Sequence, residues 1–322
     1  MKIDIFTHLV PPKYKAALGR VAPHLEAQVA RMPTIYDLDR RFRIMDKYED
    51  VRQVVTITKT AASILEDPQY GADFAKLVND EMAEIVNKYP DRFAAGVASV
   101  PMTDMDEAVR EIDRAVQGLG LKGVLLLTPI RNKPLDMEDF LPIFAKMSDL
   151  DLPIWIHPDL PIERDDYKKF FLSHVFGWPY ESTAAMTYLV LSGLYERFPQ
   201  LKIVIHHCGA LVPFFDERII ESYLASDKIF GMDHQGKLSK HPIEYFKLFY
   251  VDTALSGGTN GLMCGHAFFG AGHLLFGTDM PMDSEFGDRM IWRTIESVER
   301  MAISDQEKKM IFEDNAKKLM NL

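Results

Sequence analysis

The chain has 322 residues, a length that suits a single large α/β barrel or a pair of modest domains. Apolar residues make up 47% and charged residues 26%, close to the globular average, which excludes disordered and fibrous proteins. The net charge is −10 and no basic stripe is visible along the chain, so we expect no nucleic-acid partner.

Membrane and export signals are missing from the sequence. No apolar run approaches the roughly 18–20 residues that span a bilayer. The first residues lack the apolar core and the cleavage site of a signal peptide. Two cysteines, Cys208 and Cys264, cannot build a disulfide framework. We therefore expect a cytoplasmic protein with no membrane association.

Short β-branched runs alternate with longer amphipathic stretches, a pattern typical of βα units around a parallel sheet. Eight runs are predicted as strands: 2–6, 51–57, 93–100, 122–127, 153–157, 202–206, 248–253 and 273–277. Helices are predicted between them, for example over 73–88, 105–117, 136–149 and 182–197, with Asp73, Asp136 and Ser182 as N-caps. This count predicts an α/β fold of the (β/α)8 TIM-barrel class, with residues 1–322 as a single domain.

A doubly wound open sheet is the alternative architecture. It is disfavoured because Phe6-Thr7-His8-Leu9-Val10, which follows the first predicted strand, is not a glycine-rich phosphate loop. Three connections, 10–35, 158–180 and 226–241, are longer than a barrel needs, and we expect long loops at the carboxyl-terminal rim. The second is rich in aromatic residues, which suits either a planar substrate or a seal over the barrel mouth or a subunit interface.

Four polar residues stand where predicted strands end: His8, His157, His207 and Asp279. The carboxyl ends of all barrel strands open onto one rim, so these residues are predicted to converge. Imidazoles together with a carboxylate are ligands for zinc or for a 2-His-1-carboxylate ion such as manganese or iron. A single histidine near a strand end is more often a structural residue, but four such positions together predict a site.

Several motifs carry a resemblance to a known family. They are Ile3-Asp4-Ile5-Phe6-Thr7-His8, Pro153-Ile154-Trp155-Ile156-His157-Pro158, the block over 183–213 with its "RFP" and His-x-Gly elements, and Leu274-Leu275-Phe276-Gly277-Thr278-Asp279-Met280-Pro281. Over essentially its whole length the chain resembles the amidohydrolase superfamily. The similarity is to the amidohydrolase-related branch that contains aminocarboxymuconate-semialdehyde decarboxylase and the resorcylate decarboxylases.

The resemblance implies roles for individual residues. His8, His157 and Asp279 match metal ligands, and Asp279 can also handle protons. His207 matches the histidine of His-x-Gly, a catalytic or substrate-polarising group. His206 is expected to point the other way from the strand by the alternation of side chains.

Phe6 departs from the family pattern. The family has a histidine, or in some decarboxylases a glutamate, at this position, and phenylalanine cannot bind a metal. Three protein ligands remain, which leaves positions open for substrate. We expect a divalent metal, with zinc preferred and manganese possible. The alternative is that the metal is lost and that His207 and Asp279 act alone as acid and base.

The leading hypothesis is a metal-dependent carboxy-lyase that acts on a small planar aromatic or muconate-like carboxylic acid. Candidate substrate contacts are Trp178, Arg164 and His174, while Arg41 is a further cation able to pair with a carboxylate. One alternative is a metal-dependent hydrolase of an amide, lactone or ester in the same rim site. Another is a catalytically silent binding protein, which the loss of a ligand at Phe6 keeps open. The resemblance also implies a homo-oligomer, a dimer or higher.

Overall fold

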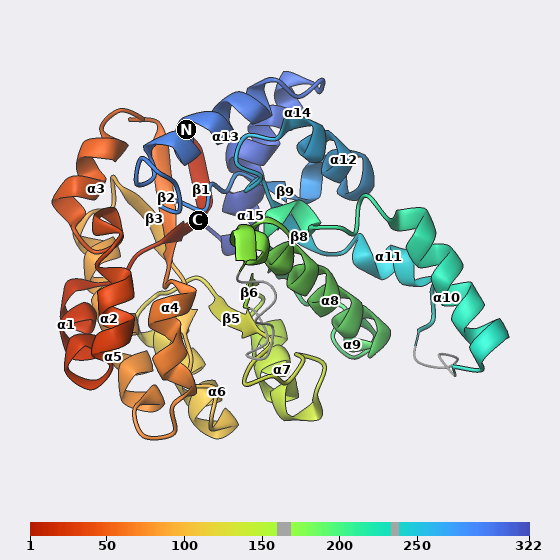
Figure 1. Ribbon diagram of the computed structural model, residues 1–322, viewed down its shortest axis with the longest axis horizontal. Helices are drawn as coiled ribbons and strands as arrows, with labels where there is room; N and C mark the ends of the chain where they lie inside the picture. The colour runs from red at the N-terminus through yellow and green to blue at the C-terminus, as the bar shows by residue number, and fades with distance from the viewer. Residues whose placement is uncertain (160–168, 233–237) are drawn as a thin grey trace.

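Parallel strands surrounded by helices form the centre of the computed structural model, which describes residues 1–159, 169–232 and 238–322 (Figure 1). The strands pair in two groups, in the orders β1-β2-β3 and β4-β5-β6-β7-β8-β9. They are β1 (Lys2–His8), β2 (Val51–Thr56), β3 (Phe93–Gly96), β4 (Ala98–Ser99), β5 (Val124–Thr128), β6 (Ile154–Pro158), β7 (Ile203–Ile205), β8 (Tyr250–Asp252) and β9 (Leu274–Leu275).

Backbone hydrogen bonds join the two groups into one closed barrel. On one side, the amide of Val97 donates to the carbonyl of Val55 at 3.0 Å, so β3 and β4 act as one strand interrupted at Val97. On the other side, the amide of Ile5 donates to the carbonyl of Phe276, and that of His8 to the carbonyl of Met280, both at 2.8 Å. The ring therefore contains the eight predicted strand positions, and the (β/α)8 prediction is confirmed.

Helices form the outer layer of the barrel (Figure 1). They are α1 (Pro12–Val21), α2 (Pro23–Val29), α3 (Leu38–Met45), α4 (Lys59–Ala62), α5 (Gly71–Lys88), α6 (Met105–Asp113), α7 (Leu141–Asp149), α8 (Trp178–Leu191), α9 (Leu194–Arg197), α10 (Asp216–Phe230), α11 (Pro242–Phe246), α12 (Thr259–Phe269), α13 (Asp288–Glu299), α14 (Asp305–Lys309) and α15 (Asn315–Met320). No helix within the described ranges is long and apolar enough to cross a bilayer.

The three predicted N-caps are wrong, although the helices themselves are present. Helix α5 begins two residues before Asp73, which lies in its first turn, where its charge still favours the helix amino terminus. Helix α7 begins at Leu141, after a short 3-10 turn, so Asp136 lies outside it. Helix α8 begins at Trp178 with a proline in its first turn, which places Ser182 inside the helix and buries it.

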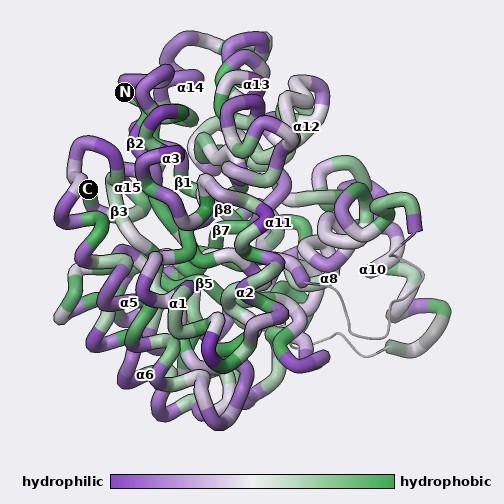
Figure 2. The backbone as a smooth tube through the Cα atoms, turned by 60° about the vertical axis from the view of Figure 1, so that its left-hand side comes forward, coloured by the Kyte–Doolittle hydropathy of each residue, from purple (hydrophilic) through white to green (hydrophobic). Residues whose placement is uncertain are grey.

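Hydrophobic residues concentrate on the strands, as the tube coloured by hydropathy shows, whereas outer helices such as α5 and α6 alternate between hydrophilic and hydrophobic positions (Figure 2). Every residue of β5 and of β6 is buried. This is the pattern expected of parallel strands covered by helices on one face and by the barrel interior on the other. In these two strands the polar residues Thr128 and His157 lie near the carboxyl ends, where the candidate site lies.

Candidate active site

Two histidines and one aspartate from distant parts of the chain meet at the carboxyl-terminal rim. His8 ends β1 and His157 lies in β6, and their ring centres are 5.3 Å apart. Nε2 of His8 lies 3.0 Å from Oδ1 of Asp279, which follows β9. Asp279 has a backbone φ of 65°, and its amide donates to the carbonyl of Phe6 at 2.9 Å. The predicted convergence of His8, His157 and Asp279 is present in the structure.

The ring orientation of His8 is set by a threonine of the neighbouring strand. The Thr56 hydroxyl donates to the carbonyl of Thr7 at 3.1 Å, so it accepts a hydrogen bond from Nδ1 of His8 at 3.0 Å. This assignment places the ring proton on Nδ1 and leaves the lone pair of Nε2 directed at Asp279.

His157 is held in a similar way. Its Nδ1 donates to the carbonyl of Pro158 at 2.7 Å, which leaves Nε2 without a proton in the neutral ring. Burial, together with the nearby imidazoles of His8 and His206, lowers the pKa of His157 to about 3. His157 is therefore neutral near pH 7, the state in which an imidazole binds a metal.

His206 lies inside the site, and the expectation that it points away is wrong. Strand β7 ends at Ile205, but the backbone of His206 is still extended, with φ −73° and ψ 160°, whereas His207 and Cys208 have φ values of 61° and 55°. His206 therefore continues the alternation of the strand, and His207 is the residue that departs from it. Nδ1 of His206 is hydrogen-bonded to Oδ2 of the buried Asp252, and its Nε2 lies 3.4 Å from Oδ1 of Asp279.

Asp252 and His206 are the two site residues that sequence reasoning missed. Asp252 ends β8, so the criterion that found the other residues, a polar side chain at a strand end, could also have found it. Burial by itself lowers the pKa of His206, but the carboxylates of Asp252 and Asp279 outweigh it and raise that pKa to about 10. Burial likewise raises the pKa of Asp279, but His206 and His8 hold it well below its usual range.

His207 packs beside His206 with ring centres 3.9 Å apart. Its Nδ1 is buried and has no hydrogen-bond partner among the described residues. Burial and the neighbouring His206 lower the pKa of His207 to about 3, so the ring is neutral near pH 7. Donor atoms of His206, His207 and Asp279 all lie within 4.8 Å of one another, close enough to share a cation.

The chemistry of these donors fits a metal cation. Nε2 of His8 and Nε2 of His206 both lie near one carboxylate oxygen, at 3.0 and 3.4 Å. A cation bound between these atoms takes the place of the ring proton of His206, because metal ligands must be deprotonated. A partner for the second ring nitrogen, supplied here by Thr56, Pro158 and Asp252, is typical of metal-binding histidines.

Phe6 lies against this group and is completely buried. Its ring stacks on that of His206, with centroids 4.1 Å apart and planes at 17°. It also lies near the rings of His8 and His157, at 5.6 and 5.9 Å. Phe6 therefore forms an apolar wall of the site.

The predicted substrate contacts are only partly described. Trp178 meets His157 edge to face with ring centres 6.3 Å apart, and His174 lies 4.3 Å from Trp178. These two rings thus extend from the site towards solvent, since His174 is exposed and Trp178 half-buried. Arg164 lies outside the described residues.

Two other candidates have structural positions. Arg41 is completely buried and donates to the carbonyl of His8 at 2.7 Å, so it is unavailable to a substrate carboxylate. Cys208 is buried, and burial raises the pKa of its thiol, so it is a structural residue and no ready nucleophile.

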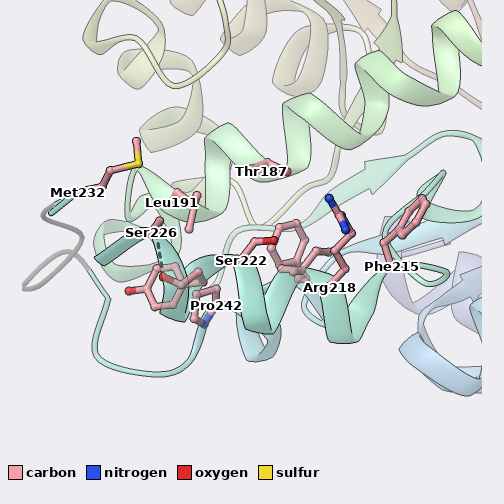
Figure 3. Close-up of a pocket in the computed structure, with 11 residues that line it drawn as sticks. Thr187, Leu191, Phe215, Arg218, Ser222, Ser226, Met232 and Pro242 are labelled. Carbon is pink, nitrogen blue, oxygen red and sulfur yellow. Dashed lines mark hydrogen bonds between the residues drawn. The ribbon is translucent and has the colours of Figure 1, made fainter. Parts of the chain in front are cut away.

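A separate apolar cavity of about 450 Å³ lies between α8, α10 and α11 (Figure 3). Thr187 and Leu191 from α8 face Arg218 and Ser222 from α10 across it. None of the residues that converge on Asp279 lines this cavity, so it is distinct from the candidate active site.

Relatives with assigned names resemble the chain over most of its length. A gamma-resorcylate decarboxylase from Polaromonas sp. is 29% identical over 304 residues, which cover 88% of this chain and 87% of that protein. A 2-amino-3-carboxymuconate-6-semialdehyde decarboxylase from Dictyostelium discoideum is 26% identical over 325 residues, covering 95% and 88% of the two chains.

Solved structures share the fold. A 5-carboxyvanillate decarboxylase from Sphingomonas paucimobilis superposes with a TM-score of 0.87 at 22% identity, covering 100% of this chain and 99% of that chain. A dihydroxybenzoic acid decarboxylase from Polaromonas sp., solved with manganese and the inhibitor 2-nitroresorcinol, has a TM-score of 0.80 at 26% identity and covers 100% and 97%. The amidohydrolase family model matches residues 3–322, which confirms the resemblance seen in the sequence motifs. This chain therefore belongs to the amidohydrolase family.

Proposed function

We propose that the protein is a metal-dependent carboxy-lyase that releases CO2 from a small planar aromatic carboxylic acid. The observation that carries the proposal is the meeting of His8, His157 and Asp279 at the rim of a barrel. It is supported by the names of the relatives, which include resorcylate and 6-methylsalicylic acid decarboxylases.

His8, His157 and Asp279 are the residues proposed to hold the divalent cation. Zinc is the first candidate because it takes imidazole and carboxylate ligands with one position open. Manganese, present in the structure of the Polaromonas relative, is the second. When bound, the cation stabilises negative charge on substrate oxygens in a site from which water is largely excluded.

His207 and Asp279 are proposed to move the proton. In the reaction, the bond between the carboxyl carbon and the ring carbon breaks, CO2 leaves, and the ring carbon takes a proton in its place. Asp279 lies among the imidazoles, and Nδ1 of His207, which meets no hydrogen-bond partner in the part of the chain that the structure describes, can hold or polarise a substrate group. A positioned acid or base of this kind contributes roughly 10²–10⁴-fold to a rate.

Trp178, His174 and Arg164 are proposed to contact the substrate. Trp178 lies edge to face against His157, so a flat ring that enters the site passes along its indole. His174 stands beside Trp178 further towards solvent. Arg164 would supply a cation for a carboxylate, a role proposed from its residue type alone.

The decisive experiment measures CO2 release from a panel of hydroxybenzoates and related aromatic acids with zinc or manganese added. We expect release by the wild-type protein and by His266→Asn, a histidine paired with Glu307 away from the site. Asp279→Asn should lower the rate by roughly 10²–10⁴-fold. Turnover confined to lactones, esters or amides would reject the lyase in favour of the hydrolase, and the absence of any turnover would favour a binding protein.

We further propose that residues 1–322 form one domain, that the protein assembles as a dimer or larger homo-oligomer, and that it works in the cytoplasm. The continuous match of the family model over residues 3–322 supports the single domain. Light scattering on the purified protein and fractionation of the source cells test the other two statements.

A further inference from the structure

Phe6 cannot donate to a metal, yet its aromatic ring lies flat against another residue that can. The stacked neighbour is His206, with ring centroids 4.1 Å apart and an interplanar angle of 17°. His206 is 1% exposed, so its ring is confined between Phe6 and the interior of the barrel. The position that lacks a metal donor, Phe6, therefore lies directly beside a residue that can supply one, His206.

The second nitrogen of His206 is firmly anchored. Nδ1 is hydrogen-bonded to Oδ2 of Asp252, a completely buried carboxylate. Oδ1 of the same carboxylate accepts from the amides of Cys208 and Ala254, at 3.1 and 3.0 Å. Asp252 is thus fixed by both neighbouring loops, and Nε2 of His206 is held towards Asp279, 3.4 Å away.

The imidazoles around Asp279 lie close to one another. His157 lies 5.3 Å from His8 and 5.6 Å from His206, measured between ring centres. Rings that bind one ion at the usual metal–nitrogen distance of about 2.1 Å, about 110° apart, have centres about 5 Å apart, and an ion with four protein ligands can take substrate as a fifth. A carboxylate behind a histidine is also the partner most often found for a metal-binding ring.

We propose that His206 is a metal ligand that replaces the donor lost at Phe6, so that His8, His157, His206 and Asp279 together hold the cation. The inference rests on the metal dependence in the proposed function, but not on the reaction that the metal serves. Phe6 then acts as a positioning residue, since its stacked ring fixes the orientation of the His206 imidazole, with Nε2 towards Asp279.

The test measures metal binding directly, with Mn²⁺ and Zn²⁺ titrated against a competing chelator. His206→Asn is expected to weaken binding by about 100-fold or more, whereas the matched variant His266→Asn, whose ring pairs with Glu307 away from the site, is expected to stay within a few-fold of the wild type. Phe6→His in the His206→Asn background returns a donor to the first strand and should recover most of the lost affinity. Circular dichroism on each variant establishes that the proteins compared are folded.

The number of imidazole ligands can also be measured on the wild-type protein. This second test does not require that any substituted protein folds. Pulsed electron paramagnetic resonance of the Mn²⁺ protein, or X-ray absorption of the Zn²⁺ protein, should give three histidine ligands. Two histidines, or a His206→Asn variant with wild-type affinity, would overturn the proposal and leave His206 as a protonated partner of Asp252 and Asp279. Tight binding through three histidines with no CO2 release would instead reject the proposed function and keep this inference.

Discussion

Phe6 and His206 form a parallel stack at the base of the candidate site, with ring centroids 4.1 Å apart. One residue comes from the first strand and the other from the end of the seventh, so the contact exists only in the closed barrel. It pairs an apolar side chain, at a position where the resemblance implies a metal ligand, with an imidazole that faces Asp279. Phe6 therefore contributes both to the packing of the barrel and to the position of His206 in the site.

Phe6→Ala is expected to destabilise the protein by about 3–5 kcal/mol, because it leaves a cavity in a fully buried position. Phe6→Leu should cost about 1.5 kcal/mol or less, since it keeps most of the volume. Urea unfolding followed by circular dichroism gives both values. Phe214→Ala, at a residue that is 73% exposed, serves as the control and should change stability little. A wild-type unfolding midpoint for Phe6→Ala would contradict the packing described here.

Asp252→Asn tests whether the carboxylate orients His206. The amide can keep the hydrogen bonds from the amides of Cys208 and Ala254 but loses the charge behind the ring. Metal affinity is expected to fall about 10–100-fold, as for other partners of metal-binding histidines. Chelator competition measures the change, and Asp91→Asn, at a side chain that is 95% exposed, should leave affinity unchanged. Equal affinity in both variants would exclude the orienting role.

Arg41→Lys is expected to destabilise the fold by about 3 kcal/mol even though the charge is kept. The guanidinium donates to Gln53 Oε1 at 2.8 Å, to the His8 carbonyl at 2.7 Å and to Thr7 Oγ1 at 3.0 Å. An ammonium group cannot serve these three directions from one buried position. The measurement is the denaturation midpoint, compared with that of the exposed Arg110→Lys. Similar midpoints for the two variants would show that the stability of the fold does not depend on the hydrogen bonds of the Arg41 guanidinium.

Asp4 makes the stability of the fold depend on pH. Burial raises its pKa to about 7, although hydrogen bonds from Thr278 and from the amide of Phe6 oppose the shift. A raised pKa means that the folded state binds the proton more tightly than the unfolded state does. The stabilisation that protonated Asp4 gives the folded state is complete below the pKa of about 4 that Asp has in the unfolded chain. It is lost as the pH rises through about 7.

The corresponding measurement is the free energy of unfolding between pH 4 and pH 8 for the wild type and Asp4→Asn. The wild type should lose on the order of 4 kcal/mol relative to the variant over this range. Asn cannot ionise, so the difference isolates the carboxyl group from other titrations. Parallel curves for the two proteins would mean that Asp4 ionises at its ordinary pKa in the folded state.

Removal of the metal is expected to abolish CO2 release and to lower the melting temperature, because the folded state alone gathers His8, His157 and Asp279. Dialysis against a chelator followed by addition of Zn²⁺ or Mn²⁺ should restore both properties. The cation that restores more activity is the functional metal. Full activity in protein shown to be free of metal would support the acid–base alternative.

Much of the site could be predicted because a barrel brings all strand carboxyl ends to one rim. The continuous apolar runs predicted the strands, and His8, His157 and Asp279 could be chosen from their place at strand ends. The same logic applies to Asp252 at the end of β8, although that aspartate belongs to none of the motifs that carry the resemblance. Its burial beside His206 is what marks it as part of the site.

The sequence by itself determined the order of strands and helices, the family and the absence of a donor at Phe6, because these depend on local residue patterns. Only the tertiary structure decided which of the two adjacent histidines faces Asp279, since the backbone stays extended at His206 and turns through positive φ at His207. It also decided that Arg41 is buried beneath His8, a contact set by the packing of α3 against β1. Such positions depend on contacts between residues far apart in the chain, and no local pattern encodes them.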